Sequence, residues 1–174
     1  MFMSKLKISL FILLASISLM GCVKNEEVIF TGAVIEFDAT TWNANAAGVN
    51  YPILTRVPPF RRAVNTSVDP VLNKNSGTVK IRINLVGPQR TTDTEITYQV
   101  LAANTTAVAG THYTALPGKV IIPANSSFGD IDLQILPTAG TPPPSSVDLV
   151  LELTGGTNVT VSPNYNRIGL RIAQ

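Results

Sequence analysis

The sequence predicts an all-β protein that folds as a two-sheet antiparallel sandwich of about seven or eight strands. Three observations support this prediction. Apolar residues alternate with polar residues in several short segments. Glycine, proline and asparagine separate those segments at short intervals. No stretch beyond residue 21 repeats its apolar residues with the helical period of about 3.6 residues.

The first residues read as an export signal rather than as part of the fold. Lys5 and Lys7 precede an apolar run, 8–20, that ends in small residues. A basic start, a short apolar core and a small-residue end are typical of a secretory signal peptide. The run is shorter than the roughly 20 residues of a membrane-spanning helix. We therefore expect residues 1–21 to be removed.

Leu-Met-Gly-Cys at 19–22 resembles the lipobox of bacterial lipoproteins. The resemblance implies cleavage before Cys22 and attachment of lipid to that residue. The alternative is ordinary secretion with a stray cysteine. Cys22 is the only cysteine in the chain, so an internal disulfide is excluded. Within the predicted tether, 22–31, Val-Lys-Asn-Glu-Glu at 23–27 is similar to the lysine-plus-acidic export signal of some Bacteroidota lipoproteins, from which it departs at Asn25. The resemblance implies an outer-membrane anchor, with the cell surface favoured over the periplasmic face. The alternative is an ordinary solvated tether.

The charge of the chain excludes one class of partner. Thirteen Lys and Arg stand against eleven Asp and Glu, and Lys5 and Lys7 belong to the signal segment. The chain that remains is close to neutral and has no long basic patch, so we expect no nucleic-acid partner. Residues 32–174 suit a single domain that can fold without a metal or a disulfide.

The first predicted strand, 33–38, places Ile35 and Phe37 on one face and Glu36 and Asp38 on the other. The alternation then stops. Residues 39–77 contain four prolines and many Asn and Ala. A segment of this length without regular structure is usually functional or mobile. We expect a long irregular insertion, with a short strand within its residues 51–57.

Two strands with strong signals follow. In TVKIRINLV, residues 78–86, every second residue is apolar, which predicts an antiparallel strand with one solvent-facing side. Gly87 and Pro88 end it. In TEITYQVL, residues 94–101, a second apolar row is predicted to face the core.

The middle of the chain is predicted to be the centre around which the other strands pair. Gly110 permits a tight corner, and Tyr113 can bury its ring nearby. Strands are predicted at 119–122 and at 128–136. Asn125 tolerates the conformation of the turn between them.

The last third predicts an exposed loop at 137–146 and an inward-facing row at 147–153. Gly155 and Gly156 are predicted to turn the chain. A short strand at 159–161 and a final row at 167–173 follow. Tyr165, just before that row, is predicted to close one end of the sandwich.

The stretch TAVAGTHYTALPGKVIIPANSS is similar to Calx-beta-like domains and to small Bacteroidota lipoproteins that share this signature. The resemblance covers roughly residues 78–173. It implies an immunoglobulin-like sandwich used in binding or adhesion. The residues that carry it are Thr106, Ala107, Gly110, Tyr113, Gly118, Ile122, Pro123, Ala124, Asn125 and Ser126.

One departure from that family concerns calcium. Calcium-binding Calx-beta domains usually have an aspartate two residues after the corner glycine, where this chain has His112. Calcium needs six to eight oxygen ligands, several of them carboxylates, and the predicted loops have few acidic residues. Asp130 and Asp132 share one face of a strand, where we expect solvation. We therefore expect no calcium, no other metal and no cofactor.

The sequence also offers no catalytic site. His112 is the only histidine, and no Gly-x-Ser-x-Gly motif is present. A serine nucleophile needs both a base and a held serine. We interpret the protein as non-enzymatic.

The irregular segment concentrates aromatic and cationic residues. Aromatic faces can stack on sugars or peptide side chains, and arginine forks bind carboxylates. The segment is therefore a candidate ligand platform, and the alternative is that its aromatics cap the sandwich. The candidate residues are Trp42, Tyr51, Arg56, Phe60, Arg61 and Arg62.

The sequence favours a lipid-anchored cell-envelope module that binds a protein or glycan ligand, or mediates adhesion. The alternative is a structural or accessory subunit of an outer-membrane complex that handles glycans or other polymers.

Overall fold

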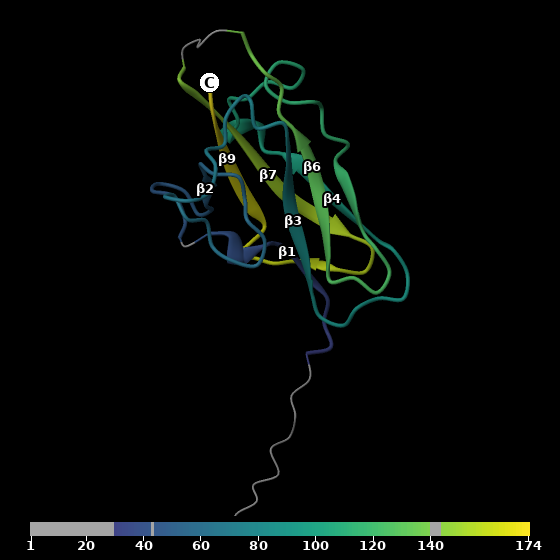
Figure 1. Ribbon diagram of the computed structural model, residues 1–174. Coiled ribbons are helices and arrows are strands. Elements are labelled where there is room, and N and C mark those ends of the chain that lie inside the picture. Colours follow the sequence, from purple (N-terminus) through teal and green to yellow (C-terminus); the bar gives the residue numbers. More distant parts are fainter. Residues whose placement is uncertain (1–29, 43, 140–143) are drawn as a thin grey trace, which may run out of the picture. The chain divides into compact units, whose positions relative to one another are not determined.

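Two β-sheets account for most of the described chain, residues 30–42, 44–139 and 144–174 of the computed structural model (Figure 1). The predicted signal segment 1–21, Cys22 and most of the tether fall outside the described residues, as do residues 140–143 of the proline-rich loop. From Thr31 to Gln174 the chain forms one compact unit. Among the described residues, no helix has both the length and the apolar character to cross a membrane.

The sheets contain four and five strands. The four-stranded sheet has the order β6–β3–β1–β8, and the five-stranded sheet has the order β2–β9–β7–β4–β5. The strands are β1 (Val34–Phe37), β2 (Ile53–Leu54), β3 (Thr78–Val86), β4 (Thr94–Val100), β5 (Lys119–Ile122), β6 (Phe128–Gln134), β7 (Ser146–Gly156), β8 (Thr160–Val161) and β9 (Arg167–Ala173). Two short 3-10 helices are η1 (Ala39–Thr41) and η2 (Ala102–Asn104).

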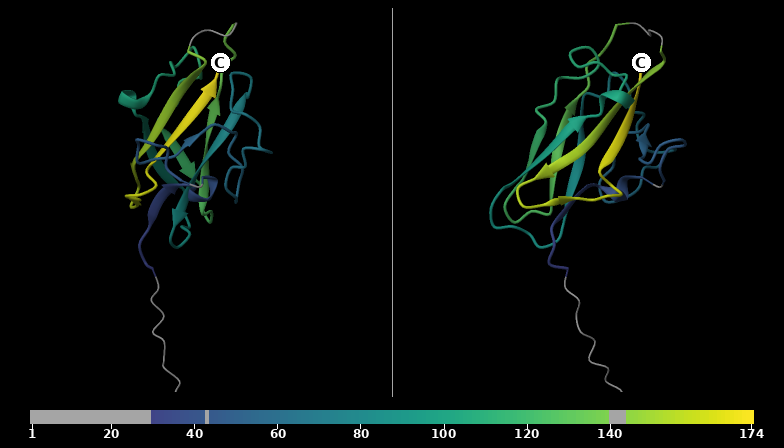
Figure 2. Two further views of the ribbon diagram at one scale, coloured as in Figure 1. Left: turned by 90° about the vertical axis from the view of Figure 1, so that its left-hand side faces the viewer. Right: turned by 180° about the vertical axis from the view of Figure 1, so that it is seen from behind.

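The alternating rows of the sequence decide which face of each strand is buried. In β3, Val79, Ile81 and Ile83 are at most 1% exposed, whereas Lys80 lies on the solvent-facing side. The same alternation holds in β6, and it is interrupted in β7 and β9 only where Val150 and Gly169 are also buried. The apolar faces of the two sheets pack against each other as one core (Figure 2). The predicted two-sheet sandwich is therefore confirmed.

The prediction of a purely antiparallel sandwich was wrong in two places. β1 runs antiparallel to β3 but parallel to β8, and β2 runs parallel to β9. The described residues also form nine strands rather than seven or eight. Alternation is typical of antiparallel sheets with one solvent-facing side, but it does not fix the direction of every neighbouring strand.

The stretch predicted to be central lies instead at the margins of the fold. Among the named strands, β5 pairs with β4 alone and β6 with β3 alone, so each is the edge of a different sheet. The chain crosses between the sheets through a turn at Asn125, whose φ is +58°. The predicted corner and anchor are confirmed, because Gly110 has φ +81° and Tyr113 is buried.

Gly155 and Gly156 lie within β7, so the prediction that they form a turn was wrong. The pairing of β7 with β4 shifts register beside Thr97, which is a β-bulge. A Cβ added to Gly156 would lie 2.7 Å from the carbonyl oxygen of Glu95. The glycines therefore permit a bulge and a close approach of two backbones, and the turn follows at Asn158, with φ +55°.

Candidate functional site

The long segment, residues 39–77, leaves β1 and returns at the start of β3. It begins at η1, where the Asp38 carboxylate accepts hydrogen bonds from the Thr40 backbone N–H at 3.1 Å and from the Asn84 side-chain amide at 3.2 Å. Asp38 is therefore buried, although the alternation of β1 predicted a solvated position. Farther along, the Val64 N–H donates to the Thr41 carbonyl at 2.9 Å, which holds the segment against η1.

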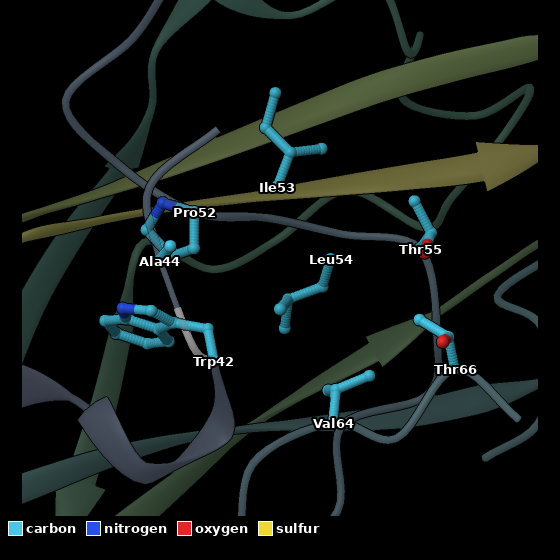
Figure 3. A pocket seen from close by; sticks show the side chains of 8 residues that line it. All are labelled: Trp42, Ala44, Pro52, Ile53, Leu54, Thr55, Val64 and Thr66. Carbon is cyan, nitrogen blue, oxygen red and sulfur yellow. The ribbon is translucent and has the colours of Figure 1, made fainter. Parts of the chain in front are cut away.

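A groove with a volume of ≈ 180 Å³ is lined by three parts of the long segment: its start, β2 with its flanking residues, and the stretch around Val64 and Thr66 (Figure 3). Trp42 and Ala44 line one end, and the hydroxyl-bearing Thr55 and Thr66 line the other. Leu54, which is 4% exposed, contributes an apolar wall between them. The remaining lining residues are Pro52, Ile53 and Val64.

Trp42 is held beside the groove by a second aromatic residue. The rings of Trp42 and Tyr165 lie 5.8 Å apart between centroids and are tilted by 57°. The Tyr165 carbonyl accepts a hydrogen bond of 2.9 Å from the Phe37 N–H, which ties this residue to β1. Tyr165, which was predicted to close one end of the sandwich, is 37% exposed and supports the indole from the side.

Asp69 accepts hydrogen bonds from two of the predicted arginines. Its carboxylate accepts from the Arg62 guanidinium in a two-pronged ion pair, and from the Asn65 backbone N–H at 2.7 Å. Arg56 donates to the Asp69 carbonyl at 3.4 Å. The hydrogen bond from Arg62, then the one from Asn65, lower the pKa of Asp69 to about 2. These bonds brace residues 56–69, the part of the long segment next to the threonine end of the groove.

Phe60 does not line the groove and lies instead on the outer face of the four-stranded sheet. Its ring lies 4.0 Å from the guanidinium carbon of Arg82, and Phe128 stacks on the same guanidinium at 3.8 Å. Arg82 also donates from Nε to Asp130 at 3.0 Å. A planar cation between two rings is a favourable cation–π arrangement. Phe60 therefore fastens the long segment to β3 and β6.

Arg61 lies between these two anchors. Its backbone adopts φ +65°, a left-handed conformation that an L-residue with a long side chain rarely adopts. The side chain is exposed, and within the described residues its guanidinium has no hydrogen-bond or ion-pair partner.

Tyr51 lies inside the fold rather than on its surface. It is 4% exposed, and a Cβ on Gly169 of β9 would lie 3.4 Å from its ring. The six predicted residues thus lie in four places. Trp42 lines the groove, Tyr51 is in the core, and Phe60 is on the outer face of the four-stranded sheet. The three arginines lie around Asp69, with Arg61 exposed. Sequence reasoning missed Asp69 and Arg82, since both look like ordinary surface charges in the sequence.

His112 makes a structural contact at the corner of Gly110. Its Nδ1 accepts a hydrogen bond of 2.9 Å from the Val108 N–H, so the neutral ring carries its proton on Nε2. Within the described ranges, no three His, Cys, Asp or Glu side chains lie close enough together to hold a metal ion.

A protein-family model described as a domain of unknown function, DUF4843, matches residues 66–173. Among curated proteins, none matches the chain. A solved structure titled as the apo form of the Calx CBD1 domain is similar, with a TM-score of 0.52 and 12% identity, over 82% of this chain and 99% of that one. This likeness shows a Calx-beta-like sandwich fold.

Two longer structures overlap only in part. CBD12 from CALX1.2 has a TM-score of 0.49 and 16% identity, over 59% of this chain and 40% of its own length. A two-domain protein of unknown function from Bacteroides fragilis NCTC 9343 has a TM-score of 0.48 and 10% identity, over 82% of this chain and 45% of its own. The chain thus spans less than half the length of each.

Proposed function

The chain belongs to the family described as a domain of unknown function, DUF4843, and we propose that it acts as a non-catalytic, lipid-anchored binding module of the cell envelope. Its ligand site is the groove between Trp42 and Thr55. The observation that carries this proposal is a partly exposed indole at one end of a groove whose other end carries hydroxyl groups.

The chemistry of the groove suits a sugar ring. An indole face packs against the C–H face of a pyranose, and threonine hydroxyls both donate and accept hydrogen bonds. Tyr165 holds Trp42 from the side and limits the rotamers that it can adopt. A side chain that is already ordered costs less conformational entropy when a ligand binds.

The size of the groove limits the ligand that it can hold. Sites for drug-sized molecules measure about 300–1,000 Å³, whereas this groove measures ≈ 180 Å³ and is open to solvent. It accommodates a single ring rather than a whole oligomer. We therefore propose recognition of one unit of a glycan whose remaining units lie along the exposed long segment.

The membrane anchor is a separate part of the proposal. Cys22 lies outside the described residues, and its position after Leu-Met-Gly is what supports lipid attachment. Several acyl chains, at about 0.8 kcal/mol per buried methylene, would keep the module at the membrane. Replacing Cys22 by Ser should release the protein from the membrane fraction, and protease treatment of intact cells should remove it if the cell surface is its location. A Cys22→Ser protein that stays with membranes would exclude the lipid anchor.

Trp42 allows a direct test of the groove, because it is the only tryptophan in the chain. The full chain in detergent should shift its intrinsic fluorescence when a bound glycan covers the indole. Trp42→Phe should remove the signal and weaken binding, measured by calorimetry, while the melting temperature stays close to that of the parent. Thr154→Val, on the solvent-facing side of β7, serves as the control and should leave binding unchanged. A glycan that binds without changing the Trp42 emission would place the site elsewhere.

A further inference from the structure

We propose that the ligand is an acidic polysaccharide, and that Arg61 binds a carboxylate on the unit next to the one in the groove. This inference rests on the proposed function and adds the chemical class of the ligand. It is carried by the way the fold presents Arg61 and by the distribution of charge around it.

Both neighbours of Arg61 are fixed to the protein. Phe60 stacks on Arg82 of β3, and Arg62 forms its ion pair with the largely buried Asp69. Arg61 itself is exposed and contacts no acceptor within the described residues. Two anchored neighbours therefore hold an unpaired guanidinium out into solvent.

The backbone of Arg61 supports the same conclusion. A left-handed conformation is unfavourable for a long side chain, and it persists only where the surroundings impose it. Glycine or asparagine would adopt φ +65° with less strain. A cation occupies the position instead, and within the described part of the chain its guanidinium has no hydrogen-bond or ion-pair partner.

The charge of the long segment is unbalanced. It carries Arg56, Arg61, Arg62 and Lys74 against one carboxylate, Asp69. On the outer faces of the sheets the cations are paired. Those pairs are Lys80–Asp132, Arg82–Asp130, Lys119–Glu95, Arg167–Glu152 and Arg171–Asp148. Arg56 and Arg62 both donate to Asp69, whereas Arg61 has no partner among the described residues. The net positive charge of the segment complements an anionic ligand.

Arg61 and the groove are close enough to bind one polymer. Val64, which lines the groove, is the third residue after Arg61, so their Cα atoms are at most about 11 Å apart. The planar guanidinium matches a carboxylate with two parallel hydrogen bonds. A uronate chain supplies both a ring for Trp42 and a carboxylate for Arg61.

The test uses the full lipidated chain in detergent with polygalacturonate, alginate and hyaluronate as probes, and fully methyl-esterified polygalacturonate as the uncharged match. At least one acidic polymer should bind and shift the Trp42 emission. Its affinity should fall as the salt concentration is raised. Polygalacturonate should bind at least as tightly as its methyl ester. An ester that binds as tightly as the best acidic polymer would overturn the inference and leave the proposed groove standing. No binding of any polymer would overturn both.

The matched variants are Arg61→Asn, Arg61→Lys and Lys74→Asn. Arg61→Asn should lower the affinity for the acidic polymer by about threefold to tenfold. It should not lower the melting temperature, since asparagine tolerates the left-handed backbone. Arg61→Lys should retain part of the affinity. Lys74→Asn removes the same charge from the same segment and should change affinity less than twofold. Equal losses for Arg61→Asn and Lys74→Asn, or no loss for Arg61→Asn, would contradict a specific role for Arg61.

Discussion

The guanidinium carbon of Arg82 lies 3.8 Å from the centre of the Phe128 ring, a side chain on the neighbouring strand. Phe60, from the long segment, stacks on the same guanidinium. The outer face of the four-stranded sheet therefore carries a packed contact across three parts of the chain. This contact joins the long segment to β3 and β6.

Arg82→Ala is expected to lower the free energy of unfolding by about 2 kcal/mol, because it removes both cation–π contacts and a half-buried ion pair. Urea unfolding measures the change. The neighbouring pair Lys80–Asp132 is exposed, so Lys80→Ala serves as the control and should cost less than about 0.5 kcal/mol. If the two variants have the same stability, the stack contributes nothing.

Asp69 should make the attachment of the long segment weaker at low pH. The Arg62 and Asn65 hydrogen bonds hold its pKa at about 2, below the usual 3.8. The charged carboxylate therefore contributes its full stability above about pH 4, and this contribution is lost as the pH falls toward 2. Amide exchange of Asn65 should accelerate in that window. In Asp69→Asn the amide should exchange faster at neutral pH and show no such transition.

Glu36 should show the opposite dependence. Partial burial, and then the neighbouring Asp38, raise the pKa of this carboxyl above 4.5. Its ionised form is therefore less favourable in the folded protein, so this group favours folding most below pH 4.5 and least above its raised pKa. Glu36→Gln should raise the melting temperature at pH 7 and have little effect at pH 4. A lower melting temperature at pH 7 would show that the charged carboxylate has a stabilising partner.

Gly156, close to the bulge of β7, should resist replacement for a steric reason. A Cβ on Gly156 would lie 2.7 Å from the Glu95 carbonyl oxygen and 2.8 Å from the Ile96 Cδ1 atom, so Gly156→Ala is expected to cost about 1–3 kcal/mol. Gly77 has φ +67° and open space around it, so its cost comes from the backbone alone. Asparagine should therefore be tolerated better than alanine at Gly77, and no better than alanine at Gly156. Denaturant midpoints of the four variants distinguish the two causes.

The sequence was most informative where one residue's environment follows from its neighbours. The alternation around Ile81 predicted the bounds of β3, because a buried face requires apolar residues at every second position. The positive φ of Asn125 and the corner at Gly110 were predictable from backbone chemistry. The all-β, two-sheet class therefore followed from local pattern, whereas the two parallel strand pairs did not.

The candidate site was only partly predictable, because its geometry depends on contacts between distant residues. Nothing near Tyr51 in the sequence indicates that Gly169 leaves room for its ring, so a buried residue was predicted as part of a binding surface. Arg61 and Arg62 are adjacent and chemically identical, yet one is paired with Asp69 and the other is exposed. That difference depends on the position of a carboxylate seven residues farther along the chain.

The two parallel strand pairs constrain the order in which this protein can fold. β1 and β2 are the first strands made, and they pair with β8 and β9, the last two. Val34, for example, pairs with Thr160, which is synthesised 126 residues later. Contacts between residues so far apart in sequence close slowly. An emerging chain therefore cannot complete either sheet until synthesis is almost finished.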